Sequence, residues 1–153
     1  MFPFYSNIKI ISGGQTGVDR AALDFALNHY IPCGGWCPKG RLAEDGEIPD
    51  KYPLTETSTS DYKQRTEKNI IDSNVSLIIH AGRMDKGTKL TIELCKEYHK
   101  PVFLINTKVK HLKTDIIRWI EENNIDVLNI AGPRESNSPG IYNETLNVLN
   151  SLL

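Results

Sequence analysis

The chain has 153 residues, which is enough for one domain with a substantial buried core, and its formal net charge is −1. It has no run of basic residues, so we expect no non-specific nucleic-acid binding, and it has no apolar stretch of about 18 residues that could cross a membrane. The segment 1–6 lacks the basic and apolar regions of a secretion signal, and the odd number of cysteines predicts reduced thiols in the cytoplasm rather than a disulfide framework.

Apolar segments typical of strands alternate along the chain with amphipathic segments typical of helices. The first strand is expected over 8–12, and a helix is expected over 18–30, where Thr16 and Asp19 resemble a capping box. A short second strand is expected over 31–36, although a proline and two glycines interrupt it. The chain therefore begins with a strand–helix–strand unit.

A long polar segment follows, from Pro38 to about Ser60, and loops of this length are usually functional or disordered. The last helix is expected to begin with Ser138 as its cap and Pro139 in the first helical position. The remaining elements are predicted as a helix from about 60 or 61 to 73, a strand over 75–80, a helix through 90–98, a strand over 101–106, a helix over 112–123, a strand over 126–131 and a helix over 141–153.

Five strands separated by helices predict parallel pairing with right-handed crossovers. We therefore expect a single α/β domain over 1–153, doubly wound, with a mostly parallel five-stranded sheet and helices on both faces. In such folds, ligands bind beyond the carboxyl ends of the strands, at the point where the strand order reverses.

The most informative motif is the glycine-rich turn after the first strand, which reads Ser-Gly-Gly-Gln-Thr-Gly over 12–17. Such a turn places backbone N–H groups at a helix N-terminus, where the helix dipole favours a phosphate-like anion. No lysine follows Gly17, so this is not a Walker A loop, and the first glycine of the dinucleotide fingerprint is replaced by Ser12. Lys39 and Arg41 further along suit a ligand that carries phosphate.

Two more glycine-bearing turns follow strands, over 81–88 and over 132–140. Because the carboxyl ends of parallel strands meet at one edge of a sheet, all three turns are expected to lie together there. Thr16 and Thr88 would add hydroxyl donors to a phosphate site, and Arg134 would add positive charge.

Several residues have both a structural and a functional interpretation. Asp19 is either a first-turn acid favoured by the helix dipole or a ligand contact, and Trp36 is either part of the core or a platform for a planar ligand. His80 ends a strand near the expected site. Cys33 and Cys37 lack a second pair of ligands at suitable spacing, so we predict no metal site.

These motifs together resemble the molybdenum cofactor carrier proteins. The resemblance rests on 12–22, on Gly-Gly-Trp-Cys-Pro-Lys-Gly-Arg over 34–41 with 43–46 and 48–49, and on 64–69, 87–88 and 131–136, so it spans nearly the whole chain. It implies a Rossmann-like fold, a homo-oligomer (a tetramer), and binding of molybdenum cofactor, a phosphorylated pterin, for delivery to molybdoenzymes. The resemblance and the turns together predict a cofactor site formed by Gly13, Gly14, Gln15, Thr16, Gly17, Arg20, Trp36, Lys39, Arg41, Arg65, Gly82, Gly87, Thr88, Arg134, Glu135 and Ser136.

A more distant resemblance is to the LOG-type phosphoribohydrolases and the DprA-related nucleotide sensors, which carry Pro-Gly-Gly-x-Gly-Thr-x-x-Glu after a central strand. This chain keeps Gly87 and Thr88 but has Thr91 where the glutamate would stand. The alternative function is therefore a nucleotide sensor or a nucleoside-monophosphate hydrolase, and a binding or carrier protein without catalytic residues is the first choice.

Overall fold

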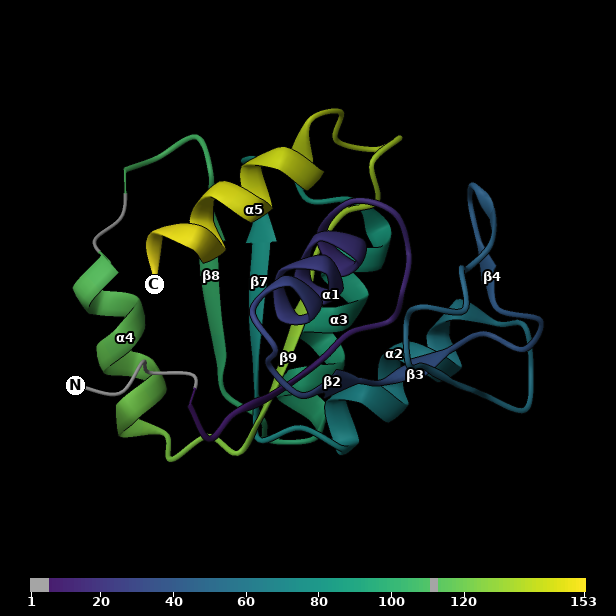
Figure 1. The fold of residues 1–153 in the computed structure, drawn as a ribbon, viewed down its shortest axis with the longest axis horizontal. Helices are drawn as coiled ribbons and strands as arrows, with labels where there is room; N and C mark the ends of the chain where they lie inside the picture. Colours follow the sequence, from purple (N-terminus) through teal and green to yellow (C-terminus); the bar gives the residue numbers. More distant parts are fainter. Residues whose placement is uncertain (1–5, 111–112) are drawn as a thin grey trace.

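The structure is a computed structural model that describes residues 6–110 and 113–153, and a five-stranded parallel sheet forms its centre (Figure 1). The strand order is β2-β1-β9-β7-β8, and each neighbouring pair is parallel. The bounds are β1 Lys9–Ile11, β2 Cys33–Gly34, β7 Val75–His80, β8 Val102–Asn106 and β9 Val127–Ala131. The predicted α/β fold is thus confirmed, and the last strand in the sequence lies in the middle of the sheet.

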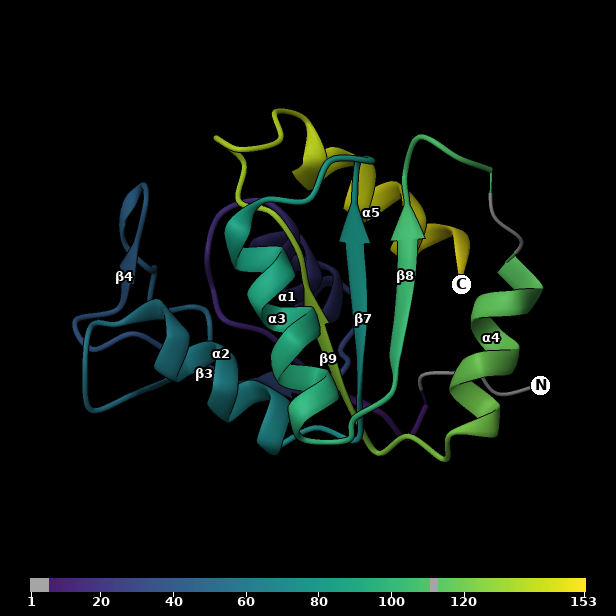
Figure 2. The ribbon, with the colours of Figure 1, turned by 180° about the vertical axis from the view of Figure 1, so that it is seen from behind.

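Helices cover both faces of this sheet. In Figure 1, α1 (Val18–Asn28) and α5 (Ile141–Ser151) lie in front of the strands, and α3 (Lys86–Glu97) lies in front in the opposite view of Figure 2. The apolar side chains of α4 (Lys113–Glu122) pack into the same core as those of α1 and α5, whereas α2 (Tyr62–Ile71) packs with α3. In the part of the chain that the structure describes, no helix is both long and apolar enough to span a membrane.

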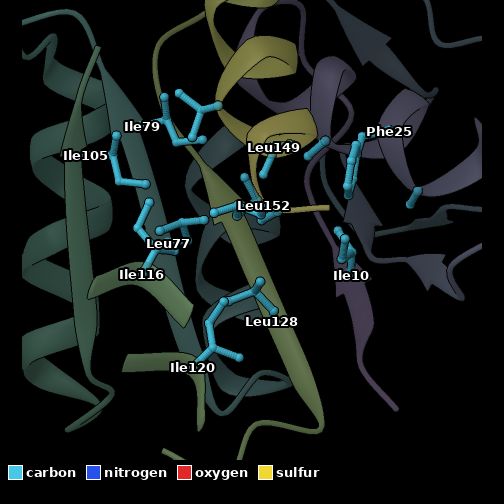
Figure 3. Close-up of a cluster of buried hydrophobic side chains, with 14 of the residues drawn as sticks. Ile10, Phe25, Leu77, Ile79, Ile105, Ile116, Ile120, Leu128, Leu149 and Leu152 are labelled. Carbon is cyan, nitrogen blue, oxygen red and sulfur yellow. The ribbon is translucent and has the colours of Figure 1, made fainter. Parts of the chain in front are cut away.

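The main core lies between one face of the sheet and the helices α1, α4 and α5 that cover it (Figure 3). All six residues of β7 are buried, which fits a central parallel strand with both faces covered. Leu77 and Ile79 of this strand meet Ile116 of α4 and Leu149 of α5 in the cluster. Each such fully buried side chain contributes about 1.5–3 kcal/mol, so this core holds the strand ends at fixed positions.

The expected second strand is divided in two at Gly35. Strand β2 pairs with β1, whereas β3 (Trp36–Cys37) leaves the main sheet and pairs with β6 (Thr55–Glu56). Gly35 has φ of +126°, and a Cβ there would lie 2.4 Å from the carbonyl oxygen of Ser12. The interruption expected from the glycines within 31–36 thus lies at Gly35, where the chain turns and only glycine fits.

The polar segment after β3 folds back on α1. It contains a hairpin of β4 (Leu42–Ala43) and β5 (Gly46–Glu47), which projects beside the main body in Figure 1. Ile48 and Tyr52 are buried in a second apolar cluster with Leu23 of α1. The segment is thus an ordered part of the domain.

Two of the expected helix caps were wrong. Gly17 is the N-cap residue of α1, and the hydroxyl of Thr16 donates instead to Glu44. Gly140 is the N-cap residue of α5, so Ser138 and Pro139 precede that helix rather than begin it. In both cases the backbone enters the helix through a glycine with positive φ, and at α5 the carboxylate of Glu135 accepts from the backbone N–H of Tyr142.

The other helix boundaries differ from expectation by a few residues. Helix α2 begins close to the expected position, and Asp61 is its N-cap residue, since the Asp61 carboxylate accepts from the backbone N–H of Lys63. Helix α1 ends at Asn28 because Tyr30 adopts a left-handed conformation, and α5 ends at Ser151. The expected start of the fourth helix at residue 112 lies outside the described residues.

Candidate functional site

The three glycine-bearing turns meet at the carboxyl edge of the sheet, where they border a cavity of about 930 Å³. The turns after β1, β7 and β9 all contribute to its wall, together with the first turns of α2 and α3. The arrowheads of β7 and β8 point to this edge in Figure 2. The cavity therefore lies where a doubly wound sheet is expected to bind a ligand.

The cavity wall carries a strong excess of positive charge. Two carboxylates line it, those of Asp19 and Asp85, and each has a partner in an ion pair or hydrogen bond. Six cationic side chains line it, from α2, α3 and the turns after β7 and β9: Lys63, Arg65, Arg83, Lys86, Lys89 and Arg134. This excess of positive charge favours the binding of an anionic ligand.

Both carboxylates are held by neighbouring groups. Asp19 is almost completely buried, and its Oδ2 lies 3.4 Å from Nη1 of Arg65. Burial raises the pKa of Asp19, and the Arg65 guanidinium opposes that rise. Burial would also raise the pKa of Asp85, but hydrogen bonds from Thr88 and Asn137 outweigh it and lower the pKa. Asp85 is thus an ionised cap of α3.

Gln15 presents a buried amide without a partner to the site. Its Oε1 accepts from the backbone N–H groups of Thr16, at 3.0 Å, and of Glu44, at 2.9 Å. Since both partners are donors, the orientation of the amide is determined. Nε2 is then the free end, and it is buried with no hydrogen-bond partner in the described structure.

Thr88 provides a second buried group of this kind, in the first turn of α3. Its side chain is 2% exposed, and Oγ1 has no hydrogen-bond partner in the residues described. Leaving a buried polar group unsatisfied costs about 1–3 kcal/mol. Both Thr88 and Gln15 line the cavity, so a ligand with acceptor atoms would satisfy them.

The two helix N-termini at this edge differ in what they can bind. At α1, the backbone N–H of Val18 donates to the carbonyl oxygen of Pro133, and a Cβ on Gly17 would lie 2.5 Å from that oxygen. The turn after β9 therefore covers the N-terminus of α1. At α3, a Cβ on Gly87 would meet only Asp85 Oδ1, at 3.9 Å, and Gly87 lines the cavity, so this N-terminus is the more accessible one.

Of the residues expected at the site, the structure brings seven to the cavity wall: Gly13, Gln15, Arg65, Gly87, Thr88, Arg134 and Ser136. Gly13 allows the guanidinium of Arg65 to pack on the turn, since a Cβ there would lie 2.4 Å from Nη1. Arg65 also donates to the carbonyl oxygen of Gly13 at 3.1 Å. Arg65 thus joins α2 to the first glycine-rich turn.

Arg20 and Arg41 lie outside the lining residues and hold backbone instead. Arg20 donates to the carbonyl oxygen of Gly14 and pairs with Asp45 at 2.9 Å. Arg41 donates to the carbonyl oxygens of four residues in its own segment, Ile48, Pro49, Tyr52 and Leu54. Both guanidinium groups therefore fix the shape of the turn and of the segment that covers α1.

The other expected residues are also outside the lining set. Trp36 donates from Nε1 to Asp72, and Lys39 is exposed. Gly82 donates its backbone N–H to Nδ1 of His80, and burial lowers the pKa of that histidine. The carboxylate of Glu135 accepts from the backbone N–H groups of residues 140 and 142 at the start of α5.

Sequence reasoning missed four of the cationic residues on the wall and one acid beside it. The signal for Lys86 and Lys89 was present, since they flank Gly87 and Thr88 in the turn that follows a buried strand. The acid is Glu44 of the β4–β5 hairpin, whose carboxylate accepts from the hydroxyls of Thr16 and Ser136. Burial would raise the pKa of Glu44, but these hydrogen bonds outweigh it and lower the pKa.

Comparison with known proteins agrees with the motif-based resemblance. The model of the circularly permutated YpsA SLOG family matches residues 10–153. A solved crystal structure from Syntrophus aciditrophicus SB, described as a "Putative molybdenum carrier protein", is similar at 50% identity over 96% of each chain, with a TM-score of 0.93. No match was found among curated proteins. The chain therefore belongs to the circularly permutated YpsA SLOG family.

Proposed function

We propose that this member of the circularly permutated YpsA SLOG family binds molybdenum cofactor, a phosphorylated pterin, and carries or protects it without converting it. The observation that carries the proposal is the pair of buried, unpartnered groups, Gln15 Nε2 and Thr88 Oγ1, on a wall with six cations. The name of the similar structure from Syntrophus aciditrophicus, a putative molybdenum carrier, supports this choice of ligand.

The cavity suggests how such a ligand is held. The phosphate is placed at the N-terminus of α3, where Lys86 and Lys89 supply charge and Gly87 allows close approach. The hydroxyl of Thr88 donates to a phosphate oxygen, and the amide of Gln15 donates to an acceptor atom elsewhere on the ligand. Lys39 and Arg41 remain predicted contacts that depend on how the ligand extends beyond the lined cavity.

Lys86→Ala tests this placement directly. A hydrogen bond between a charged side chain and phosphate contributes about 1.5–3 kcal/mol, so molybdopterin affinity is expected to fall about tenfold to hundredfold in a titration followed by calorimetry. Lys96→Ala is the matched control, because it removes the same charge near the other end of α3. Equal affinities for the two variants would place the phosphate elsewhere.

The alternative is a nucleotide sensor or nucleoside-monophosphate hydrolase, since a cationic cavity also suits a nucleotide phosphate. Hydrolysis needs a positioned acid or base, worth about 10²–10⁴-fold in rate. The hydroxyl of Thr91 donates to the carbonyl oxygen of Gly87, and Glu93 is exposed. Tight binding of AMP with no saturable binding of molybdopterin would select the sensor, and release of free base from AMP would select the hydrolase.

The proposal extends to how the carrier works in the cell. We place it in the cytoplasm as a homotetramer that delivers its ligand to molybdoenzymes, as the resemblance implies. Light scattering coupled to size-exclusion chromatography tests the tetramer. Reconstitution of a cofactor-free molybdoenzyme by the loaded protein tests delivery, and no transfer would restrict the function to storage.

A further inference from the structure

The carboxylate of Glu44 lies in a pocket of hydrogen-bond donors that come from two of the three turns. Its oxygens accept from Thr16 Oγ1, from Ser136 Oγ and from the backbone N–H of Ser136, the last at 3.1 Å. Arg134 Nε lies 3.5 Å from Glu44 Oε2. These are donors that proteins also use to bind phosphate, and the Glu44 side chain is only 20% exposed.

The pocket has more donors than this carboxylate satisfies. Nε of Arg134 is buried and has no hydrogen-bond partner among the described residues, although Glu44 is its ion-pair partner. A carboxylate offers two oxygens in one plane, whereas a tetrahedral oxyanion offers oxygens in several directions and can meet a larger set of donors. Arg134 and Ser136 also line the main cavity, so the pocket opens onto it.

We infer that this pocket is an oxyanion subsite of the ligand cavity, and that Glu44 fills it as an internal competitor until the ligand's tetrahedral oxyanion displaces the side chain. The inference rests on the proposed function, because it assigns a further part of the same ligand site. The oxyanion is a molybdate group or a second phosphate, which share this chemistry, because the first phosphate is proposed to lie at the N-terminus of α3. The backbone N–H of Glu44 stays on Gln15 Oε1, so the hairpin need not leave.

The inference predicts that removing the Glu44 carboxylate strengthens oxyanion binding. A site that is occupied by an internal group for nine-tenths of the time binds its ligand about tenfold more weakly than an open one. Glu44→Ala should therefore bind inorganic phosphate or molybdate at least about tenfold more tightly than the unmodified protein in calorimetric titrations. The two anions are titrated separately, and the one whose affinity rises identifies the group that the pocket takes.

Two further variants make the test specific. Glu47→Ala removes the same charge from the same hairpin, where the side chain is exposed, and should leave both affinities unchanged. Adding Ser136→Ala to Glu44→Ala removes one donor and should reverse most of the gain. Unchanged binding in Glu44→Ala, or an equal gain in Glu47→Ala, would overturn the inference.

The outcome also separates this inference from the proposed function. If Glu44→Ala binds neither anion more tightly while Lys86→Ala still weakens molybdopterin binding, the subsite is wrong and the carrier function stands. If Glu44→Ala gains oxyanion affinity but no variant binds molybdopterin, the subsite stands and the identity of the ligand is wrong.

Discussion

Arg65 is predicted to stabilise the fold through one buried ion pair, and Arg65→Met tests it. Asp19 is 8% exposed and Arg65 12% exposed in their side chains, with 3.4 Å between Oδ2 and Nη1. Removing one partner of a buried pair leaves an uncompensated charge and costs about 3–5 kcal/mol. For a domain of this size, a loss of about 3 kcal/mol lowers the melting temperature by about 6–12 °C.

The ion-pair explanation predicts that the stability loss in Arg65→Met depends on pH, which a general packing defect would not do. Burial already raises the pKa of Asp19 above its unfolded value, so protonation of Asp19 favours the folded state. Without Arg65 that pKa rises further. The penalty of Arg65→Met should therefore be fully present at pH values above the raised pKa of Asp19 and should shrink as the pH falls through it.

Urea denaturation at several pH values measures these free energies of unfolding. Lys63→Met is the matched control, since it removes the same charge from an exposed position on α2. Asp19→Asn added to Arg65→Met should restore at least about 2 kcal/mol, because it removes the unpaired charge. A double variant no more stable than Arg65→Met, or a penalty that is constant with pH, would refute the ion-pair reasoning.

Three more predictions follow from single contacts. Gly17→Ala should prevent folding, detected as loss of the cooperative thermal transition, because φ is +79° and the new Cβ would lie 2.5 Å from the carbonyl oxygen of Pro133. Arg41→Ala should expose the segment 48–54 to limited proteolysis within an otherwise folded protein, and an unchanged cleavage pattern would contradict its role. Burial and the hydrogen bond to Asp24 raise the pKa of Tyr142 to about 12, so its stabilising effect is present below about pH 10 and lost as the pH rises through 12. Tyr142→Phe should make the free energy of unfolding less dependent on pH over that range. A pH dependence identical to that of the unmodified protein would argue against the raised pKa.

The pattern of the sequence predicts the elements well because each strand and helix buries one recognisable face. The β-branched segment 75–80 is buried throughout, as its composition indicates. Periodicity carries no information on strand order, so the position of β9 between β1 and β7 could not be read from it. The glycines indicated a break within 31–36, but they did not indicate that β3 pairs with β6 outside the main sheet.

The candidate site shows the same division between local and distant information. Gly13, Gln15 and Thr88 lie in turns that follow strands, and the turns identify the edge of the sheet. Basic residues were expected from the segment nearest the first turn in sequence, but the cationic wall comes mainly from α2 and α3. Glu44 lies 28 residues from Thr16, and no spacing in a polar segment indicates that contact.

The central position of β9 makes the site a property of the whole chain. The wall combines residues from Gly13 to Asn137, and the turn after β9 both covers the N-terminus of α1 and supplies Arg134 and Ser136. The cavity therefore forms only after the last strand has inserted between β1 and β7. A ligand that binds there interacts with the folded state alone, and at 100 times its dissociation constant it would add about 2.7 kcal/mol to stability. Ligand binding in the cavity and completion of the fold are thus thermodynamically linked, so a bound ligand would be released whenever β9 and its turn detach.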